Sequence, residues 1–260
     1  MGKIIPQHIK HINKPPKVIS LFSGAGGMDI GFEAAGFEIA VAVEYDPSCC
    51  QTLRKNKPNL PVIEGDITKI DSAEILNRAG LEPLEAGLVI GGPPCQSFSL
   101  AGKRLGMDEP RGRLVLEFIK KVREILPVAF VMENVKGMTN WQGGAALKAI
   151  EEALAEPIIY NGETYHYVMR HKVLDAADYG APQFRERVFI VGNRIGKDFS
   201  FPDKTHGLRD EQASLFKENE IRDYVTVIDA IGKLPEAEGP SEVAKRVSET
   251  IKDRIKKHGY

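Results

Sequence analysis

Hydrophobic residues in the first three quarters of the chain gather in short runs that alternate with amphipathic segments. The runs that are nearly continuous in Val, Ile, Leu, Ala and Phe are Val18–Phe22, Glu38–Tyr45, Leu60–Asp66, Gly87–Gly92, Val128–Asn134 and Arg187–Asn193. Strands with this pattern are usually buried on both faces, as in a parallel sheet that helices cover. The runs therefore predict an open α/β sheet.

Helix signals lie between these runs. Asp46-Pro47 has the form of an N-cap followed by proline at the first helical position, which predicts a helix over Ser48–Asn56. Leu114–Leu126 and Ala145–Leu154 each place apolar residues on one face at helical spacing. Strands and helices that alternate in this way predict right-handed crossovers, with helices on both faces of the sheet.

The pattern changes after Asn193, and the chain divides into three segments. Residues 1–17 contain four lysines, two histidines and no acidic residue, which predicts a basic N-terminal arm. Residues 18–200 form the α/β domain, and residues 201–260 a polar connection followed by helices. The last helix carries Val243, Val247, Ile251 and Ile255 at successive i+4 positions. A helix with so narrow an apolar stripe more often packs against another part of the protein or a partner than stands alone in solvent.

Composition narrows the class of protein. The 260 residues are 42% hydrophobic and 27% charged with a net charge of −1, which excludes a wholly disordered chain and a collagen-like one. No apolar run approaches the roughly 18 residues of a membrane span, and the first residues lack the apolar core of a signal peptide. Three cysteines, two of them adjacent, indicate a reducing cytoplasm rather than a disulfide framework.

Three consecutive strand ends carry groups that suit a nucleoside cofactor. Gly24, Gly26 and Gly27 follow the first predicted strand at the start of a helix, where the backbone can approach a ligand. Glu44 ends the second strand, where a carboxylate can bind ribose hydroxyls. Asp66 ends the third strand, where it can meet an adenine edge. The pattern does not distinguish a dinucleotide from S-adenosylmethionine.

The next two strand ends carry reactive groups. Cys95 follows two prolines that stiffen the loop after the fourth strand, at the edge where such sheets bind ligands. Cys49 and Cys50 lie within an amphipathic helix and are most simply packing residues. Glu133 ends the fifth strand and adds a carboxylate to the edge that holds Cys95.

Six short motifs lie at or next to the predicted strands. They are Phe22–Gly27 (FSGAGG), Glu44, Gly65-Asp66, Pro94-Cys95-Gln96, Glu133-Asn134-Val135 and Gln183-Phe184-Arg185-Glu186-Arg187. In order and spacing they resemble the motifs of the cytosine-5 DNA methyltransferases, over roughly residues 18–235. The resemblance implies a Rossmann-like, S-adenosylmethionine-dependent methyltransferase sheet, in which residues 18–200 are the catalytic and cofactor-binding domain.

The resemblance also implies covalent catalysis. Carbon 5 of cytosine is a poor nucleophile, and addition of the Cys95 thiolate at carbon 6 makes it reactive toward a sulfonium methyl group. Glu133 would hold a proton at ring nitrogen 3, Arg187 would meet the cytosine carbonyl oxygen, and Arg185 would lie near the nucleophile loop. The base that removes the carbon 5 proton is not identified.

The cofactor and substrate contacts follow from the same resemblance. The cofactor is S-adenosylmethionine, with S-adenosylhomocysteine as product and no metal, and its expected contacts are Phe22, Ser23, Gly24, Ala25, Gly26, Gly27, Glu44, Tyr45, Asp66, Ile67, Pro93 and Leu114. The partner is double-stranded DNA, from which the cytosine must be flipped out. The expected DNA contacts are Gln96, Ser97, Ser99, Lys103, Arg104, Arg111, Asn134 and Gln183, several of them on a flap over residues 97–113.

Three alternatives remain open. A tRNA cytosine-5 methyltransferase would use the same catalytic set. A dinucleotide-dependent oxidoreductase would explain the glycine turn and Glu44 but would leave Cys95, Glu133 and the arginine pair without roles. A catalytically silent DNA-binding relative would have no need of these residues.

Family members continue beyond the arginine motif into a target-recognition domain, a Gln-Gly-Phe-Pro motif and a final Asn-x-Val helix that helps wall the cofactor site. These features do not occur in the 260 residues. Either the sequence is a fragment of a longer chain or the enzyme is split, and we expect the second: a two-chain enzyme of a restriction-modification system. A second polypeptide would supply recognition and the closing helix, and would dock on the stripe that begins at Val243.

Overall fold

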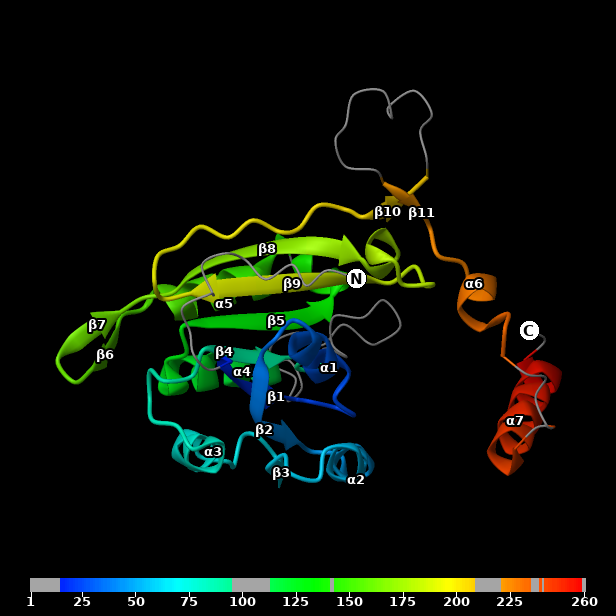
Figure 1. The fold of residues 1–260 in the computed structure, drawn as a ribbon, viewed down its shortest axis with the longest axis horizontal. Coiled ribbons are helices and arrows are strands. Elements are labelled where there is room, and N and C mark those ends of the chain that lie inside the picture. The colour runs from blue at the N-terminus through cyan, green and yellow to red at the C-terminus, as the bar shows by residue number, and fades with distance from the viewer. Residues whose placement is uncertain are drawn as a thin grey trace.

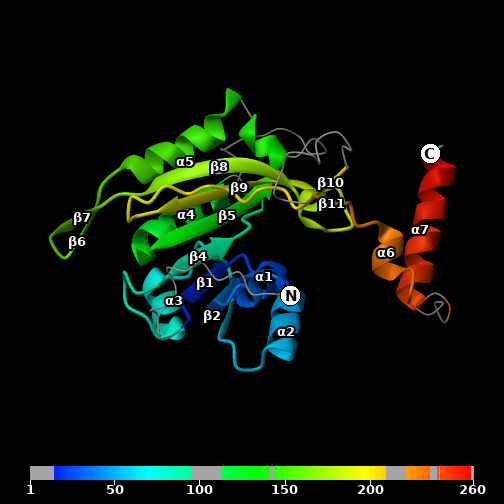
Figure 2. The same cartoon turned by 45° about the horizontal axis from the view of Figure 1, so that its top comes forward.

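The predicted α/β sheet is confirmed by the computed structural model, which describes residues 15–94, 113–140, 143–208, 221–234, 239 and 241–258. A seven-stranded sheet has the order β3-β2-β1-β4-β5-β9-β8, with helices packed against it (Figures 1 and 2). Its strands are β1 (Lys17–Leu21), β2 (Glu38–Glu44), β3 (Val62–Glu64), β4 (Leu88–Gly91), β5 (Ala129–Val135), β8 (Val168–Asp175) and β9 (Glu186–Asn193). The helices are α1 (Gly27–Ala34), α2 (Pro47–Asn56), α3 (Ser72–Ala79), α4 (Arg113–Ile125), α5 (Ala145–Ala155), α6 (Val227–Ile231) and α7 (Glu242–His258).

The apolar runs of the sequence correspond to β1–β5 and β9. Strands β1 to β5 pair in parallel, whereas β9 is antiparallel to both of its neighbours, β5 and β8. Because β9 enters the sheet in the opposite direction, its first residues lie at the edge where β5 ends, and Arg187 pairs with Val135. This reversal brings the arginine motif to the catalytic edge.

Short elements connect these parts. Two single-turn 3₁₀ helices follow β5 and β8, at Lys136–Thr139 and Ala176–Tyr179. The pair β6 (Ile158–Tyr160) and β7 (Glu163–Tyr165) forms a hairpin before β8. The pair β10 (His206–Gly207) and β11 (Arg222–Asp223) lies in the polar connection after the sheet.

The helix start predicted at Asp46-Pro47 is confirmed. The Asp46 carboxylate accepts hydrogen bonds from the backbone N–H groups of Ser48 (2.8 Å) and Cys49 (3.1 Å), with proline at the first position of α2. Cys50 on this helix is fully buried, and its burial raises the pKa of its thiol to about 11. Such a thiol carries little thiolate near neutral pH, which fits the expected packing role.

The main core lies between the sheet and helices α4 and α5. Phe118 of α4 packs edge-on against Phe130 of β5, with ring centroids 6.2 Å apart, and both side chains are fully buried. Val188 and Ile190 of β9 join the same cluster. The opposite face of β1 and β4 is covered by side chains of α1, so the central strands are buried on both faces.

The face of β5 and β9 that points away from α4 and α5 is more open. Burial alternates along both strands, and Val131, Phe189 and Val191 are only half-buried. No described helix covers this face (Figure 1). We call it the open face, defined by the side chains of Val131, Glu133, Arg187, Phe189 and Val191.

The C-terminal helices stand apart from the sheet in both views (Figures 1 and 2). The predicted apolar stripe is present on α7, where Val243, Val247 and Ile251 are 61%, 50% and 52% exposed. The side chain of Ile255 lies outside the described residues. Among the helices that the structure describes, none is long and apolar enough to cross a membrane.

Candidate active site

The glycine turn after β1 is tightly wound. Phe22, Gly24 and Gly26 have φ angles of 52°, 56° and 88°. A positive φ is strained for Phe22, and such strain is typical of turns that position a ligand. The Ser23 hydroxyl is buried within hydrogen-bond distance of the carbonyl oxygens of Ser20 (3.0 Å) and Val43. Ala25 and Gly27 are exposed on the outer side of the turn.

Glu44 ties the glycine turn to β2. Its Oε2 accepts a 2.7 Å hydrogen bond from the Gly24 N–H, and its Oε1 accepts from the N–H groups of Tyr45 and Asp46, both at 2.8 Å. A carboxylate has about four acceptor positions, so one remains for a ligand hydroxyl. The Tyr45 ring next to it is 73% exposed. The structure thus brings Glu44 and the turn together, as the sequence predicted.

Asp66 lies on the neighbouring strand end. Its Oδ1 accepts from the N–H (3.0 Å) and hydroxyl (2.8 Å) of Thr68, and these bonds lower the pKa of the carboxyl. Among the described residues, no hydrogen bond involves Oδ2. Ile67 and Pro93 are buried, and Leu114 packs against the core from the start of α4. Cofactor contacts of these residues stay predictions.

Glu133 and Arg187 form the centre of the catalytic edge. The Glu133 Oε1 lies 2.8 Å from the Arg187 Nε, with side-chain exposures of 24% and 22%. Glu133 is opposite Phe189, and Arg187 stands two positions away on the same face of β9, a diagonal that long side chains can bridge. The carboxylate also lies close to the chain after β4, because a Cβ added to Gly92 would be 3.3 Å from Glu133 Oε2.

A hollow of about 500 Å³ opens beside this ion pair. Its wall is mainly apolar and is formed by Glu133, Leu174, Asp175, Ala176, Tyr179, Ala181, Arg185, Arg187, Phe189 and Pro202. The Arg185 N–H donates a 2.9 Å hydrogen bond to Asp175 Oδ1, which fixes the loop before β9. A polar pair in an apolar hollow is typical of a site that binds a flat, partly polar ring.

Asn134, which the sequence predicted as a DNA contact, is buried beside the chain that follows β4. It is 2% exposed, its Nδ2 donates to the Pro93 carbonyl oxygen (3.1 Å), and its Oδ1 accepts from the Val135 N–H (2.8 Å). In this geometry Asn134 holds the chain that leads from Pro93 to Cys95. Its contact with DNA stays a prediction, as does that of Gln183, which is exposed on the loop before β9.

The expected nucleophile and flap lie outside the described residues. They include Cys95, Gln96, Ser97, Ser99, Lys103, Arg104 and Arg111. The described residues before this gap end at Pro94, two residues after Gly92, which lies close to the Glu133 carboxylate.

Sequence reasoning missed a buried polar pair beneath the glycine turn. Ser20 Oγ donates a 2.6 Å hydrogen bond to Asp29 Oδ1, and both residues are almost completely buried. Asp29 Oδ2 has no hydrogen-bond partner among the described residues. Burial raises the pKa of this carboxyl. The available signal was an acidic residue next to apolar residues in the first turn of α1.

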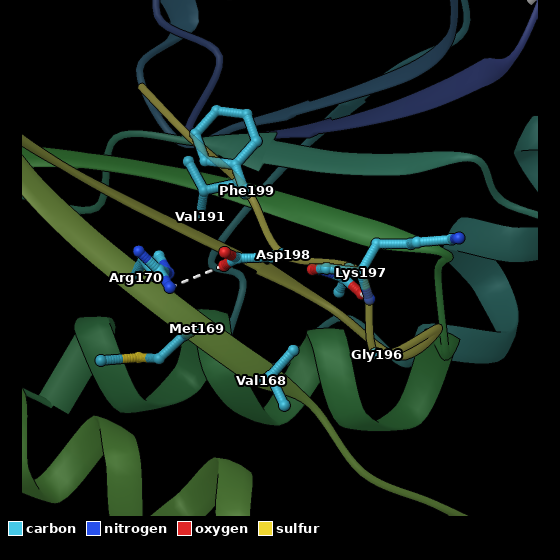
Figure 3. Close-up of a pocket in the computed structure, with 9 residues that line it drawn as sticks. Val168, Met169, Arg170, Val191, Gly196, Lys197, Asp198 and Phe199 are labelled. Atoms are coloured by element: carbon cyan, nitrogen blue, oxygen red, sulfur yellow. Dashed lines mark hydrogen bonds and ion pairs between the residues drawn. The ribbon is translucent and has the colours of Figure 1, made fainter. Parts of the chain in front are cut away.

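A second hollow, of about 250 Å³, lies at the far end of β8 and β9 (Figure 3). Arg170 reaches across it to Asp198, with a 2.7 Å ion pair, and Val168 and Phe199 lie on its wall. Val168 pairs with Asn193, whereas Leu174 pairs with Arg187, so the two hollows are at opposite ends of the strands. Within the described part of the chain, no group of three or more acidic, histidine or cysteine side chains could hold a metal ion.

Comparison with known proteins agrees with this geometry. Type II methyltransferase M.AquIA of Picosynechococcus sp. is 65% identical over 246 residues, which are 94% of this chain and 99% of the relative. M.SacI of Streptomyces achromogenes is 35% identical, and the match covers 90% of this chain but 62% of that protein. The crystal structure of a prophage-encoded DNA modification methyltransferase (E. coli) superposes with a TM-score of 0.66 at 28% identity, over 87% of this chain and 57% of that one.

The family model described as C-5 cytosine-specific DNA methylase matches residues 16–259, which include both the glycine turn and the Glu133–Arg187 pair. The dinucleotide-dependent oxidoreductase is thereby excluded, since it gave the pair no role. With this match over nearly its whole length, the chain belongs to the C-5 cytosine-specific DNA methylase family.

Proposed function

We propose that this chain transfers a methyl group from S-adenosylmethionine to carbon 5 of a flipped-out cytosine in a specific DNA sequence, through a covalent adduct with Cys95. The observation that carries the proposal is the 2.8 Å Glu133–Arg187 pair, which faces an apolar hollow and lies close to the chain two residues before Pro94. A carboxyl group and a guanidinium side by side match the ring nitrogen 3 and carbonyl oxygen of cytosine.

In this mechanism the Cys95 thiolate adds to carbon 6 of the ring and breaks the 5,6 double bond. Glu133, when protonated, donates its proton to ring nitrogen 3, and Arg187 binds the carbonyl oxygen that gains electron density. Carbon 5 becomes enamine-like and takes the methyl group. Loss of the carbon 5 proton to a base, elimination of Cys95 as thiolate and return of the nitrogen 3 proton to Glu133 then restore the aromatic ring.

The residues at the first three strand ends fit the cofactor. Gly24 has open space where a side chain would lie, Glu44 keeps one acceptor position beside it, and Asp66 Oδ2 is available to an amino group. When bound there, S-adenosylmethionine supplies an electrophilic sulfonium methyl. Glu44 would orient its ribose, Asp66 its adenine, and Tyr45 would cover the ring, with Phe22, Ile67, Pro93 and Leu114 as apolar walls.

The decisive experiment replaces the nucleophile. Cys95→Ser should abolish methyl transfer while binding of S-adenosylhomocysteine, measured by calorimetry, stays near that of the wild type. Plasmid DNA and tRNA methylated side by side would identify the nucleic acid, and a covalent adduct with 5-fluorocytosine DNA would show that the chain is not catalytically silent. Turnover by the purified Cys95→Ser protein would refute the assigned nucleophile.

We further propose that a second polypeptide completes the enzyme, within a restriction-modification system of the cytoplasm. Support comes from two apolar surfaces. The open face has half-buried Val131 and Val191, and α7 presents an exposed stripe of Val243, Val247 and Ile251. A closing helix against the open face and a recognition domain on the stripe would remove both from water.

A further inference from the structure

An exposed aromatic side chain lies beside the catalytic hollow. Phe184 precedes Arg185, which lines the hollow, yet the Phe184 side chain is 75% exposed. A large apolar ring that is mostly exposed contributes little to the core. We therefore look for its role in binding a partner or ligand. The proposed mechanism gives Phe184 no part.

The ring is held firmly from behind. It packs edge-to-face on Tyr224, with ring centroids 5.5 Å apart and an interplanar angle of 72°. The Tyr224 hydroxyl donates a 3.1 Å hydrogen bond to Oδ1 of buried Asp178, whose Oδ2 pairs with the Lys204 ammonium at 2.6 Å. We call Phe184 and Tyr224 the aromatic platform.

The surrounding backbone anchors the platform as well. The Asp178 carbonyl oxygen accepts a 2.9 Å hydrogen bond from the Thr205 N–H, and the Tyr179 hydroxyl donates to the Pro202 carbonyl oxygen at 3.0 Å. These bonds fix the segments on which Tyr224 rests, so the surface behind the Phe184 ring is formed before any ligand arrives.

We infer that the aromatic platform stacks against a nucleobase that flanks the flipped cytosine in the DNA substrate. Extrusion of one base removes stacking from its neighbours. A preformed aromatic face next to the hollow that receives the extruded base can restore that stacking, and every base offers a suitable face. The inference rests on the proposed function, because it requires a flipped base at Glu133 and Arg187.

Stacking is favoured over a purely electrostatic contact at this place. Charges around the platform are mixed: Lys136 pairs with Glu186 at 2.7 Å, and Lys204 pairs with Asp178. Paired cations attract phosphate groups weakly, whereas an exposed ring contributes wherever an unstacked base can reach it.

The test compares variants in conditions where the wild type methylates DNA. Phe184→Leu keeps an apolar side chain but removes the aromatic face, and should weaken DNA binding roughly five- to fifty-fold. Phe184→Tyr should restore binding, and S-adenosylhomocysteine affinity and melting temperature should not change. The matched control is Phe199→Leu, since Phe199 also belongs to an edge-to-face pair (with Phe201, 5.1 Å) but lines the far hollow, and it should leave DNA affinity unchanged.

Fluorescence distinguishes direct stacking from an indirect effect. The chain has a single tryptophan, Trp141, so Phe184→Trp in a Trp141→Phe background reports on the platform alone. Binding of cytosine-containing duplex DNA should quench this indole fluorescence. The inference would be overturned if Phe184→Leu left DNA affinity unchanged. It would also be overturned if the indole signal responded to a protein partner and not to DNA. In either case methyl transfer by the wild type would still support the proposed function. Absence of both DNA binding and methyl transfer by the wild type, with the second polypeptide supplied, would overturn both.

Discussion

In the proposed mechanism, Glu133 transfers a single proton to the cytosine ring. Its replacement by glutamine keeps the size of the side chain but removes both the transferable proton and the charge that pairs with Arg187. We expect kcat for methyl transfer to fall roughly 10²- to 10⁴-fold, the usual contribution of a general acid, with unchanged cofactor affinity. The control is Glu186→Gln, an exposed carboxylate that pairs with Lys136 and should leave kcat near wild type. Equal kcat values for the two variants would contradict the role of Glu133.

Glu44 works through its backbone partners as well as through any ligand. Glu44→Ala leaves the N–H groups of Gly24, Tyr45 and Asp46 without their acceptor. We expect binding of S-adenosylhomocysteine to weaken by roughly 1–3 kcal/mol, and a similar loss for Asp66→Ala. Glu64→Ala is the matched control, because Glu64 is opposite Glu44 on β3 but pairs at the surface with Arg54. Calorimetry that gives one affinity for all of these proteins would refute the pocket.

At the scale of elements, the sequence predicted the strands that are deeply buried and missed the one that is not. β8 forms the outer edge of the sheet and is largely exposed, so its residues VMRHKVLD lack the apolar run that marks β1 and β4. The antiparallel direction of β9 was also missed, because a buried strand has the same pattern in either direction. The position of Glu44, Asp66 and Glu133 at the strand ends could be predicted because their motifs are local. The Phe184–Tyr224 contact could not, since it joins segments separated in sequence.

The buried Asp29 carboxyl at the start of α1 makes the free energy of unfolding depend on pH. Burial raises the pKa of Asp29 above that of an unfolded aspartate, so the folded state binds the proton more tightly and loses stability as pH rises through this range. Asp29→Asn keeps an acceptor for the Ser20 hydroxyl and carries no charge. We therefore expect the variant to gain stability relative to the wild type as the pH rises above about 4, the pKa of an unfolded aspartate, as measured by thermal unfolding. A difference that is independent of pH would show that Asp29 is not the titrating group.

At the scale of the whole molecule, the two-chain proposal makes the activity of the chain depend on a partner that covers its exposed apolar surfaces. On the two-chain hypothesis, the isolated chain should show little or no sequence-specific methylation, and the second polypeptide should restore it. Val247→Asp places a charge in the exposed stripe of α7 and should weaken that association at least tenfold without lowering the melting temperature, because Val247 is already 50% exposed. Glu249→Ala on the same helix is the control. Bisulfite sequencing of DNA treated with the chain alone decides the matter: one defined sequence methylated at an ordinary enzymatic rate would mean that the chain needs no partner.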